Sequence, residues 1–310
     1  MSKTKNNKDI ALPIGRYIDL LTDFGFKLIF GTERNKDVLI AFLNELFKGR
    51  KVIRDIIYNP QEKKGPVKDY RSSSFDITCT GANGETFIVE MQRANQKFFT
   101  DRAIYYTATK LHEQGPKGKK NWDFELKEVY FIAIMDFNFE NIQPDKYLHY
   151  VRLADEETGK IFYDKLGYIF IELPNFNIEE KDIKTNLECW LFVLRNMWKV
   201  EKISVFLREK IFQKLFQIAE IANLKKEEYI MYEKDLMDKW TEYSVLKTAK
   251  ERGREEGMEK GIEKGMEQKS YEVVANLIIK LGLNDEQAAN IADVPVATVK
   301  KIRASLKKKK

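Results

Sequence analysis

Three polar side chains interrupt a segment that otherwise alternates like a β-hairpin, SSFDITCTGANGETFIVEMQR, residues 73–93. Asp76 falls in the first predicted strand, and Glu90 and Gln92 fall in the second. Strands favour β-branched and aromatic residues, so two carboxylates and an amide at these positions need an explanation. Carboxylates that face one another repel, and proteins separate them, protonate them or bridge them with a cation.

The length of the turn decides whether the two carboxylates meet. A two-residue turn pairs Asp76 with Val89. A three-residue loop, residues 82–84, pairs Asp76 with Glu90 on one face of the hairpin. Glycine at the last loop position, Gly84, favours the three-residue loop with its G1 bulge. In that register the two carboxylate side chains are about 5 Å apart at Cβ.

Two facing carboxylates with no His or Cys nearby suit a hard cation such as Mg²⁺ or Mn²⁺. The whole chain has two histidines and two cysteines, which argues against a His/Cys zinc site and against a disulfide framework. Alternatively, the two acids lie on the solvated face of an open antiparallel sheet and bind nothing. The hairpin residues alone leave both interpretations open.

The composition is that of a globular protein. The chain has 310 residues, of which 43% are hydrophobic and 33% are charged. It has no apolar run of the length that a membrane span needs, and its first residues, MSKTKNNKDIALP, have no apolar stretch typical of a secretory signal. We therefore expect a cytoplasmic protein with no membrane partner, whose residues 1–15 form a flexible arm.

Hydrophobic periodicity predicts the elements that position the acids. A mixed α/β domain is expected over residues 16–176, in the order helices, hairpin, helix, buried strand. Helices are expected within residues 16–31, 36–47 and 98–114, and further strands within residues 52–60, 128–137 and 167–176. The segment EVYFIAIMDF, residues 128–137, is the most apolar and is expected at the centre of the sheet. A helical region follows over residues 177–250, and we expect its aromatic residues to form a core.

The C-terminal region carries a glycine repeat and then a basic tail. Glycine recurs every fourth residue in ERGREEGMEKGIEKGMEQK, which predicts a linker helix over residues 251–269. This helix is either a solvated connection or a face that pairs closely with another chain. Residues 270–310 have the spacing of a helix-turn-helix, and a plain helical hairpin fits them as well. The last 18 residues hold seven basic groups and one acid, which equals the whole net charge of +6. Lys300, Lys301 and Arg303 are the DNA-contacting candidates of this tail.

The hairpin acids resemble a known family. Asp76, followed fourteen residues later by Glu90-Met91-Gln92, resembles the PD-(D/E)XK nuclease superfamily and, more narrowly, the PD-(D/E)XK family transposases, also called recombination-promoting nucleases. The likeness covers about residues 16–175, through the segments TDFGFKLIFG (22–31), FLNELF (42–47), IVEMQ (88–92), DRAIYY (101–106) and VYFIAI (129–134). The glycine repeat and the short C-terminal unit also look like the tail of this family.

The resemblance implies a restriction-endonuclease-like core, with a mixed sheet flanked by helices, and DNA cleavage that depends on Mg²⁺ or Mn²⁺. Asp76, Glu90 and the backbone carbonyl of Met91 would be the metal ligands. Gln92 takes the place of the superfamily's catalytic lysine, so it can orient water but adds no positive charge. Lys27 or Arg93 could supply part of that charge.

Further residues have two possible roles each. Thr22 or Asp23 could be the N-cap of the first helix. Asp23 is otherwise an acid of the metal site, and Lys27 lies one helical turn away on the same face. Arg102 and Tyr106 share a face of the next predicted helix, where they either contact phosphate or cover the sheet.

These observations predict a metal-dependent DNA endonuclease associated with transposition or recombination. The alternative is a non-cleaving DNA-binding or oligomeric scaffold derived from the nuclease fold, which the change from lysine to Gln92 and the helical tail both allow. DNA is the expected partner, together with a second copy of the chain through the C-terminal helices.

Overall fold

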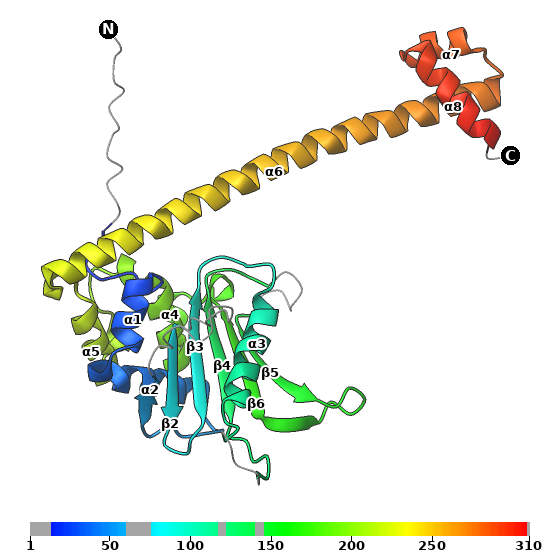
Figure 1. Cartoon of the computed structure of the whole chain (residues 1–310). Helices are drawn as coiled ribbons and strands as arrows, with labels where there is room; N and C mark the ends of the chain where they lie inside the picture. The colour runs from blue at the N-terminus through cyan, green and yellow to red at the C-terminus, as the bar shows by residue number, and fades with distance from the viewer. Residues whose placement is uncertain (1–13, 60–75, 117–121, 140–145, 309–310) are drawn as a thin grey trace, which may run out of the picture. The chain divides into compact units, whose positions relative to one another are not determined.

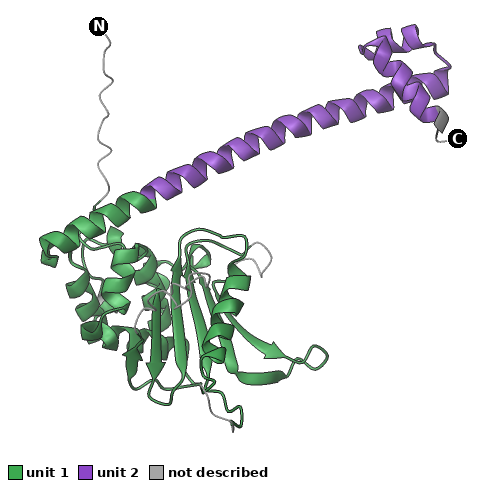
Figure 2. Cartoon of the chain, viewed as in Figure 1, with its two compact units in different colours: residues 1–239 green, residues 240–310 purple. Residues whose placement is uncertain are grey.

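The computed structural model describes residues 14–59, 76–116, 122–139 and 146–308. The chain divides into two compact units, residues 1–239 and residues 240–310 (Figure 2). Most of the predicted N-terminal arm lies outside the described residues, and so do residues 60–75, which include the first residues of the hairpin segment. None of the helices in the described ranges combines the length and the apolar character that a membrane crossing needs.

A six-stranded mixed sheet forms the centre of the first unit (Figure 1). Its strands are β1 (Ile56–Tyr58), β2 (Ile77–Gly81), β3 (Thr86–Gln92), β4 (Val129–Met135), β5 (Leu148–Ala154) and β6 (Ile161–Glu172), in the spatial order β1-β2-β3-β4-β6-β5. Strands β3, β4 and β6 are parallel, and the other pairs are antiparallel. This mixed sheet with flanking helices and an all-helical C-terminal region confirms the predicted fold class.

Strand β4 lies between two parallel neighbours and is buried along its whole length, as the sequence predicts. Both of its faces are covered, which is why the strand is apolar at every position. Strand β5 is not among the predicted strands. It lies at the edge of the sheet and is largely exposed, so it lacks the apolar pattern that marks β4. Strand β6 begins at Ile161, earlier than the predicted start at residue 167. Its first residues are exposed, as in β5, so the sequence has no apolar run there.

Helix α3 (Phe99–His112) covers one face of the sheet (Figure 1). Phe99 and Ala103 of the helix pack in one buried cluster with Ile88 of β3 and Phe131 of β4. Two-residue alternation places Glu90 on the same face of β3 as Ile88. The face that carries Glu90 is therefore covered by a helix, not open to solvent.

Helices α1 (Asp23–Phe30), α2 (Lys36–Leu46), α4 (Asn186–Asn196) and α5 (Lys210–Ala219) belong to the opposite side of the sheet. Phe47 after α2 meets Tyr130 of β4 edge-on, with ring centroids 4.7 Å apart. Trp190 of α4 contacts Phe42 of α2 and Phe212 of α5. Short 3₁₀ segments occur at Glu33–Asn35, Leu173–Asn175, Glu180–Asp182, Met197–Lys199, Val205–Leu207 and Ile221–Asn223. The predicted aromatic core forms at Trp190, Phe212 and Phe216, whereas Phe192, Trp198 and Phe206 are half-buried.

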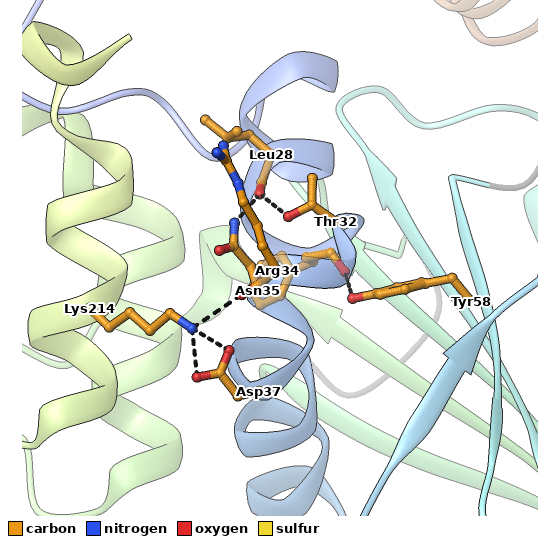
Figure 3. Close-up of polar contacts among 8 residues, drawn as sticks. Leu28, Thr32, Arg34, Asn35, Asp37, Tyr58 and Lys214 are labelled. Carbon is orange, nitrogen blue, oxygen red and sulfur yellow. Dashed lines mark hydrogen bonds and ion pairs between the residues drawn. The ribbon is translucent and has the colours of Figure 1, made fainter.

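Polar contacts fix α1 and α2 to their neighbours (Figure 3). Lys214 of α5 donates to both carboxylate oxygens of Asp37 on α2, at 2.6 and 2.8 Å. Tyr58 of β1 donates its hydroxyl proton to the backbone carbonyl of Phe30, the last residue of α1. Helix α1 is thereby tied to the edge of the sheet at the level of the hairpin.

Helix α6 (Lys226–Leu281) begins in the first unit and continues into the second. In the second unit its last turns pack with α7 (Asp285–Ala292) and α8 (Val296–Lys308). The buried cluster there is formed by Val274, Ala288, Ala289, Val299 and Ile302. Asp293 ends α7 in the left-handed conformation, with φ of 51°, at the position where the sequence lacks the usual turn glycine.

Candidate active site

The hairpin register brings the two acids opposite one another. Ile77 of β2 pairs with Val89 of β3, so the next position in the same register sets Asp76 opposite Glu90. The connecting loop has three residues and ends at Gly84, whose φ is +84°. The predicted three-residue loop is therefore confirmed, and the two-residue alternative is wrong. The positive φ explains why glycine is needed at this position.

Asp76 immediately precedes β2 and is half-buried. Its Oδ2 atom accepts a hydrogen bond of 2.9 Å from the backbone N–H of Met91. Burial raises the pKa of Asp76, while this hydrogen bond and the charge of Lys27 oppose the rise. The charge of Asp23 adds to it. The carboxylate is thus held in place beside other charged groups.

Glu90 is the most deeply buried acid of the hairpin pair, with 2% of its surface exposed. Burial, followed by the charge of Asp76, raises the pKa of Glu90 to about 8. Gln92 donates from Nε2 to Oε2 of Glu90 at 3.1 Å. Within the described part of the chain, no group forms a hydrogen bond with the other oxygen, Oε1. A buried carboxylate oxygen without a partner is costly, and a proton or a cation would satisfy it.

The donor set at the hairpin fits a divalent metal ion. The N–H of Met91 points at Asp76, and the carbonyl of the next residue, Gln92, accepts from Asp136 on the β4 side. Because backbone groups alternate in direction along a strand, the Met91 carbonyl points to the side of Asp76. Two carboxylates and one carbonyl suit Mg²⁺, which keeps several water ligands. Among the described residues, no cluster of three or more His, Cys, Asp or Glu side chains could hold a metal, so any set of protein ligands at the hairpin acids would have to include other groups or water.

Helix α1 brings Asp23 and Lys27 to the same place. The N-cap is Thr22, whose hydroxyl oxygen accepts from the N–H of Gly25 at 3.0 Å. The interpretation of Asp23 as the N-cap is therefore wrong. Asp23 instead forms an ion pair of 2.7 Å with Lys27, one turn further along. Both charges act on Asp76, so α1 contributes to the electrostatics of the hairpin acids.

A cleft of about 360 Å³ opens beside Asp76. Its lining comes from α1, the β1–β2 edge of the sheet and the beginning of α6. The lining residues are Asp23, Phe24, Lys27, Leu28, Gly31, Thr32, Tyr58, Asn59, Asp76, Ile77, Thr78, Met231 and Asp235. Sequence reasoning missed Asn59, Thr78, Met231 and Asp235. The two α6 residues carry no signal in the sequence, because they lie more than 150 residues after Asp76 along the chain.

The family model of the PD-(D/E)XK nuclease family transposases matches residues 20–249. The chain belongs to this family. A role as a nuclease, related to transposition, follows from this membership, and nucleases of this family generally use divalent metals. Comparison of the chain with curated proteins and with solved structures yields no match.

In this PD-(D/E)XK family member, Arg102 of α3 lies near the acid pair. Its charge lowers the pKa of both Asp76 and Glu90. Its Nη1 atom donates to Gln96 at 2.6 Å, whereas Nε and Nη2 form no hydrogen bond with any described residue. Tyr106 lies one turn further along α3, and the guanidinium carbon of Arg102 is 5.8 Å from its ring centroid. The guanidinium of Arg102 thus packs against the rings of Phe99 and Tyr106, and its Nε and Nη2 atoms are buried.

The remaining predicted residues lie in different settings. Arg93 directly follows Gln92 and is half-buried. In the second unit, Lys300 and Lys301 are exposed on α8. Arg303 instead donates to Asp285 at 2.6 Å and to the backbone carbonyl of Leu283 at 2.6 Å. Because these contacts hold α8 to the start of α7, a structural role explains Arg303 better than a phosphate contact.

Proposed function

We propose that this PD-(D/E)XK family member is a DNA endonuclease that hydrolyses phosphodiester bonds with Mg²⁺ or Mn²⁺. The observation that carries the proposal is the buried pair of Asp76 and Glu90. The pKa values of both acids are raised and Oε1 of Glu90 has no partner among the described residues, so Arg102 and Lys27 do not supply all of the positive charge that the two carboxylates need. A divalent cation would supply that charge, and an inert surface pair would not be buried in this way.

Each side chain has a role that its geometry supports. Asp76, Glu90 and the Met91 carbonyl would hold the metal, which lowers the pKa of a bound water and stabilises charge on the transition state. Gln92 orients Glu90 through its 3.1 Å hydrogen bond, and its amide can hold water. The charges of Arg102 and Lys27 lower the pKa of Asp76, so both residues would help to keep this metal ligand ionised.

Nicking of supercoiled plasmid tests the proposal. The wild-type protein is expected to nick DNA with Mg²⁺ or Mn²⁺ and to be inactive with a chelator. Asp76→Asn and Glu90→Gln each keep the side-chain shape, and each should reduce the rate by about a hundredfold or more, because the metal's contribution is several kcal/mol. Glu156→Gln, which neutralises an exposed acid in the turn after β5, is the matched control and should keep the wild-type rate. Normal cleavage by both hairpin variants would overturn the assignment.

A non-cleaving DNA-binding scaffold is the second candidate function. The observation that favours it is Gln92, a neutral amide where the superfamily has a lysine. Gln92→Lys separates the two candidates, since a cation beside the metal site favours the transition state. If the wild type is a nuclease, the variant should keep or raise the nicking rate. If the wild type binds DNA without nicking it and the variant does nick it, the scaffold is the correct assignment.

The proposal has two further parts. The first is that the protein acts in transposition or recombination, and the second is that it self-assembles through the C-terminal helices. Family membership supports the first. The second is supported by the exposed glycine face of α6, formed by Gly253, Gly257, Gly261 and Gly265. Apart from the backbone of the helix itself, no described atom lies within 4 Å of the place that a β-carbon would take at these four glycines.

A further inference from the structure

The cleft beside Asp76 is lined by both apolar and polar side chains. Its apolar residues are Phe24, Leu28, Ile77 and Met231. Its uncharged polar side chains include Asn59 and Thr78 at the β1–β2 edge. A cleft of this volume falls within the range of small-molecule sites, in which apolar walls and a few polar groups set the orientation of the occupant.

The polar groups of the cleft offer both hydrogen-bond donors and acceptors. Asn59 accepts from Thr80 through its side-chain oxygen at 3.0 Å, which leaves the amide N–H groups as donors. Thr78 Oγ1 is buried and has no hydrogen-bond partner among the described residues. Asp235 of α6 accepts from the backbone N–H of Phe24 at 2.6 Å, and a carboxylate can accept several further hydrogen bonds.

The charge of the cleft indicates whether a phosphate or a nucleobase can bind there. Asp23, Asp76 and Asp235 line it, and Lys27 is the one basic residue among the described side chains of the lining, already paired with Asp23. Even with Asp76 neutralised by the proposed metal ion, Asp23, Lys27 and Asp235 leave the rest of the cleft with a net negative charge, which would repel a phosphate there. An uncharged nucleobase would not be repelled, and its exocyclic amino groups and ring N–H groups are donors that a carboxylate accepts.

We propose that this cleft receives one nucleobase of the cut DNA strand, unstacked from its neighbours and adjacent to the scissile phosphate. The proposal rests on the proposed endonuclease function, because Asp76 belongs both to the metal site and to the cleft. A base that enters such a pocket must first leave the helical stack, as in enzymes that flip a base. The preferred substrate is therefore DNA with an unpaired or weakly paired base beside the cut.

Helix α6 gives the cleft a firm wall. The hydroxyl oxygen of Tyr232 accepts a hydrogen bond of 2.9 Å from the backbone N–H of Asp19, and Lys239 donates to Oδ2 of Asp19 at 2.6 Å. Together with the bond from Phe24 to Asp235, these contacts come from successive turns of α6. Met231 lies on the same stretch and is 59% exposed, so a larger side chain can be placed there without disturbing the core.

The test combines a missing base in the DNA with a filled cleft in the protein. Duplex oligonucleotides carry a single abasic position, moved one nucleotide at a time across the cut site. With the wild-type protein, one position next to the cut should reduce the cleavage rate by about tenfold or more, the loss typical of a good base contact. Met231→Trp should cut the intact duplex at that reduced rate, and the same abasic position should then have no further effect. Ile230→Trp, whose residue is 55% exposed on the same helix but does not line the cleft, should behave as the wild type does.

The outcomes separate this proposal from the proposed function. If the wild type cleaves and no single abasic position matters, or if both tryptophan variants behave alike, the base pocket is wrong and the nuclease assignment stands. If the wild type cleaves nothing, the nuclease assignment fails. Fluorescence anisotropy then measures the affinity for the same duplexes. The base pocket predicts that one abasic position weakens binding by the wild type and that this difference is lost in Met231→Trp. A cleft that holds a cation would instead respond to Asp235→Asn and not to abasic DNA, which also contradicts the proposal.

Discussion

Glu90 carries an ionisable group at a place where water does not solvate it. Its side chain is 2% exposed, and its Oε1 atom has no hydrogen-bond partner among the described residues. Ionising this carboxyl requires free energy, because hydration is lost and because Asp76 repels the negative charge. The proposed divalent cation would offset both effects. Without a bound cation, the arrangement therefore lowers the stability of the fold at high pH.

The pH dependence of stability should reveal this acid. Folding raises the pKa of Glu90 from 4.5 to about 8, so between these values the folded state binds more protons than the unfolded state. The contribution of Glu90 is thus fully present below about pH 4.5 and is lost as the pH rises toward 8. Without metal, Glu90→Gln should melt at a higher temperature than the wild type at pH 8, and the difference should shrink toward pH 5. Differential scanning fluorimetry measures it, with the exposed Glu156→Gln as control. An unchanged difference across this range would contradict the buried acid.

The residue types predicted the facing acids but not their burial. Gly84 fixed the loop length, and the two-residue period then fixed the register. The same alternation also fits a sheet with one solvated face, so nothing in the hairpin indicated that α3 covers Glu90. Thr22 and Asp23 are neighbours and both residue types cap helices, which is why the sequence left the cap of α1 open.

Helix α6 contributes to the first unit through its first turns. Asp19 precedes α1 and is 2% exposed, and its carboxylate accepts from Lys239 at 2.6 Å and from the N–H of Leu21 at 2.9 Å. The bond from Phe24 to Asp235 satisfies an N–H group at the start of α1 that has no partner within the helix. The position of Lys27 therefore depends on α6, which follows it by about 200 residues.

Removing Lys239 should destabilise the first unit. Lys239→Met keeps the aliphatic stem but leaves the charge of Asp19 buried without its partner, and losses of about 2–4 kcal/mol are expected for such a change. Urea denaturation followed by tryptophan fluorescence measures the free energy of unfolding. The exposed Lys234→Met on the same helix is the control and should change it by less than about 0.5 kcal/mol. The double variant Asp19→Asn/Lys239→Met should recover part of the loss, because no unpaired charge then remains.

Elements with strong patterns were predictable, and elements that depend on distant contacts were not. The uninterrupted apolar run of β4 requires cover on both faces, which indicated its central position. Strand β5 is an edge strand whose pairing with β6 shifts register near Leu153, so its sequence shows little alternation. The start of α6 falls within the predicted helical region of residues 177–250, but its role at the cleft depends on contacts with Asp19 and Phe24, which lie about 200 residues earlier in the chain.

At the scale of the whole molecule, the glycine repeat of α6 should pair two copies of the chain. Gly257 and Gly261 have open space around them, and Met258 and Ile262 are exposed beside them at 65% and 49%. Gly257→Leu/Gly261→Leu should weaken the dimer by about tenfold or more, because the two backbones can no longer approach closely. Sedimentation equilibrium at tens of micromolar measures it. A monomeric wild type at that concentration would contradict the prediction.

The control for the glycine variant must exclude loss of the helix itself. Leucine favours a helix by about 0.8 kcal/mol per site relative to glycine, so circular dichroism should report equal or higher helicity in the variant. Glu259 and Glu263 lie about half a turn away from the glycines on the same stretch. Glu259→Leu/Glu263→Leu adds the same apolar side chains on the other side and should leave the glycine-mediated dimer intact.

The basic C-terminal tail should supply non-specific DNA affinity through its exposed lysines. Deleting residues 293–310 would remove Val299 and Ile302 from the buried cluster of the second unit, so weaker binding could reflect unfolding. Lys300→Gln/Lys301→Gln changes exposed side chains only. The slope of log affinity against log salt should become shallower by about 0.9 for each phosphate that the variant no longer binds. Arg303→Gln is the informative contrast: because Arg303 is bound to Asp285, that variant should lower the melting temperature of the second unit instead. An unchanged salt slope in the double lysine variant would assign the DNA contacts to the first unit.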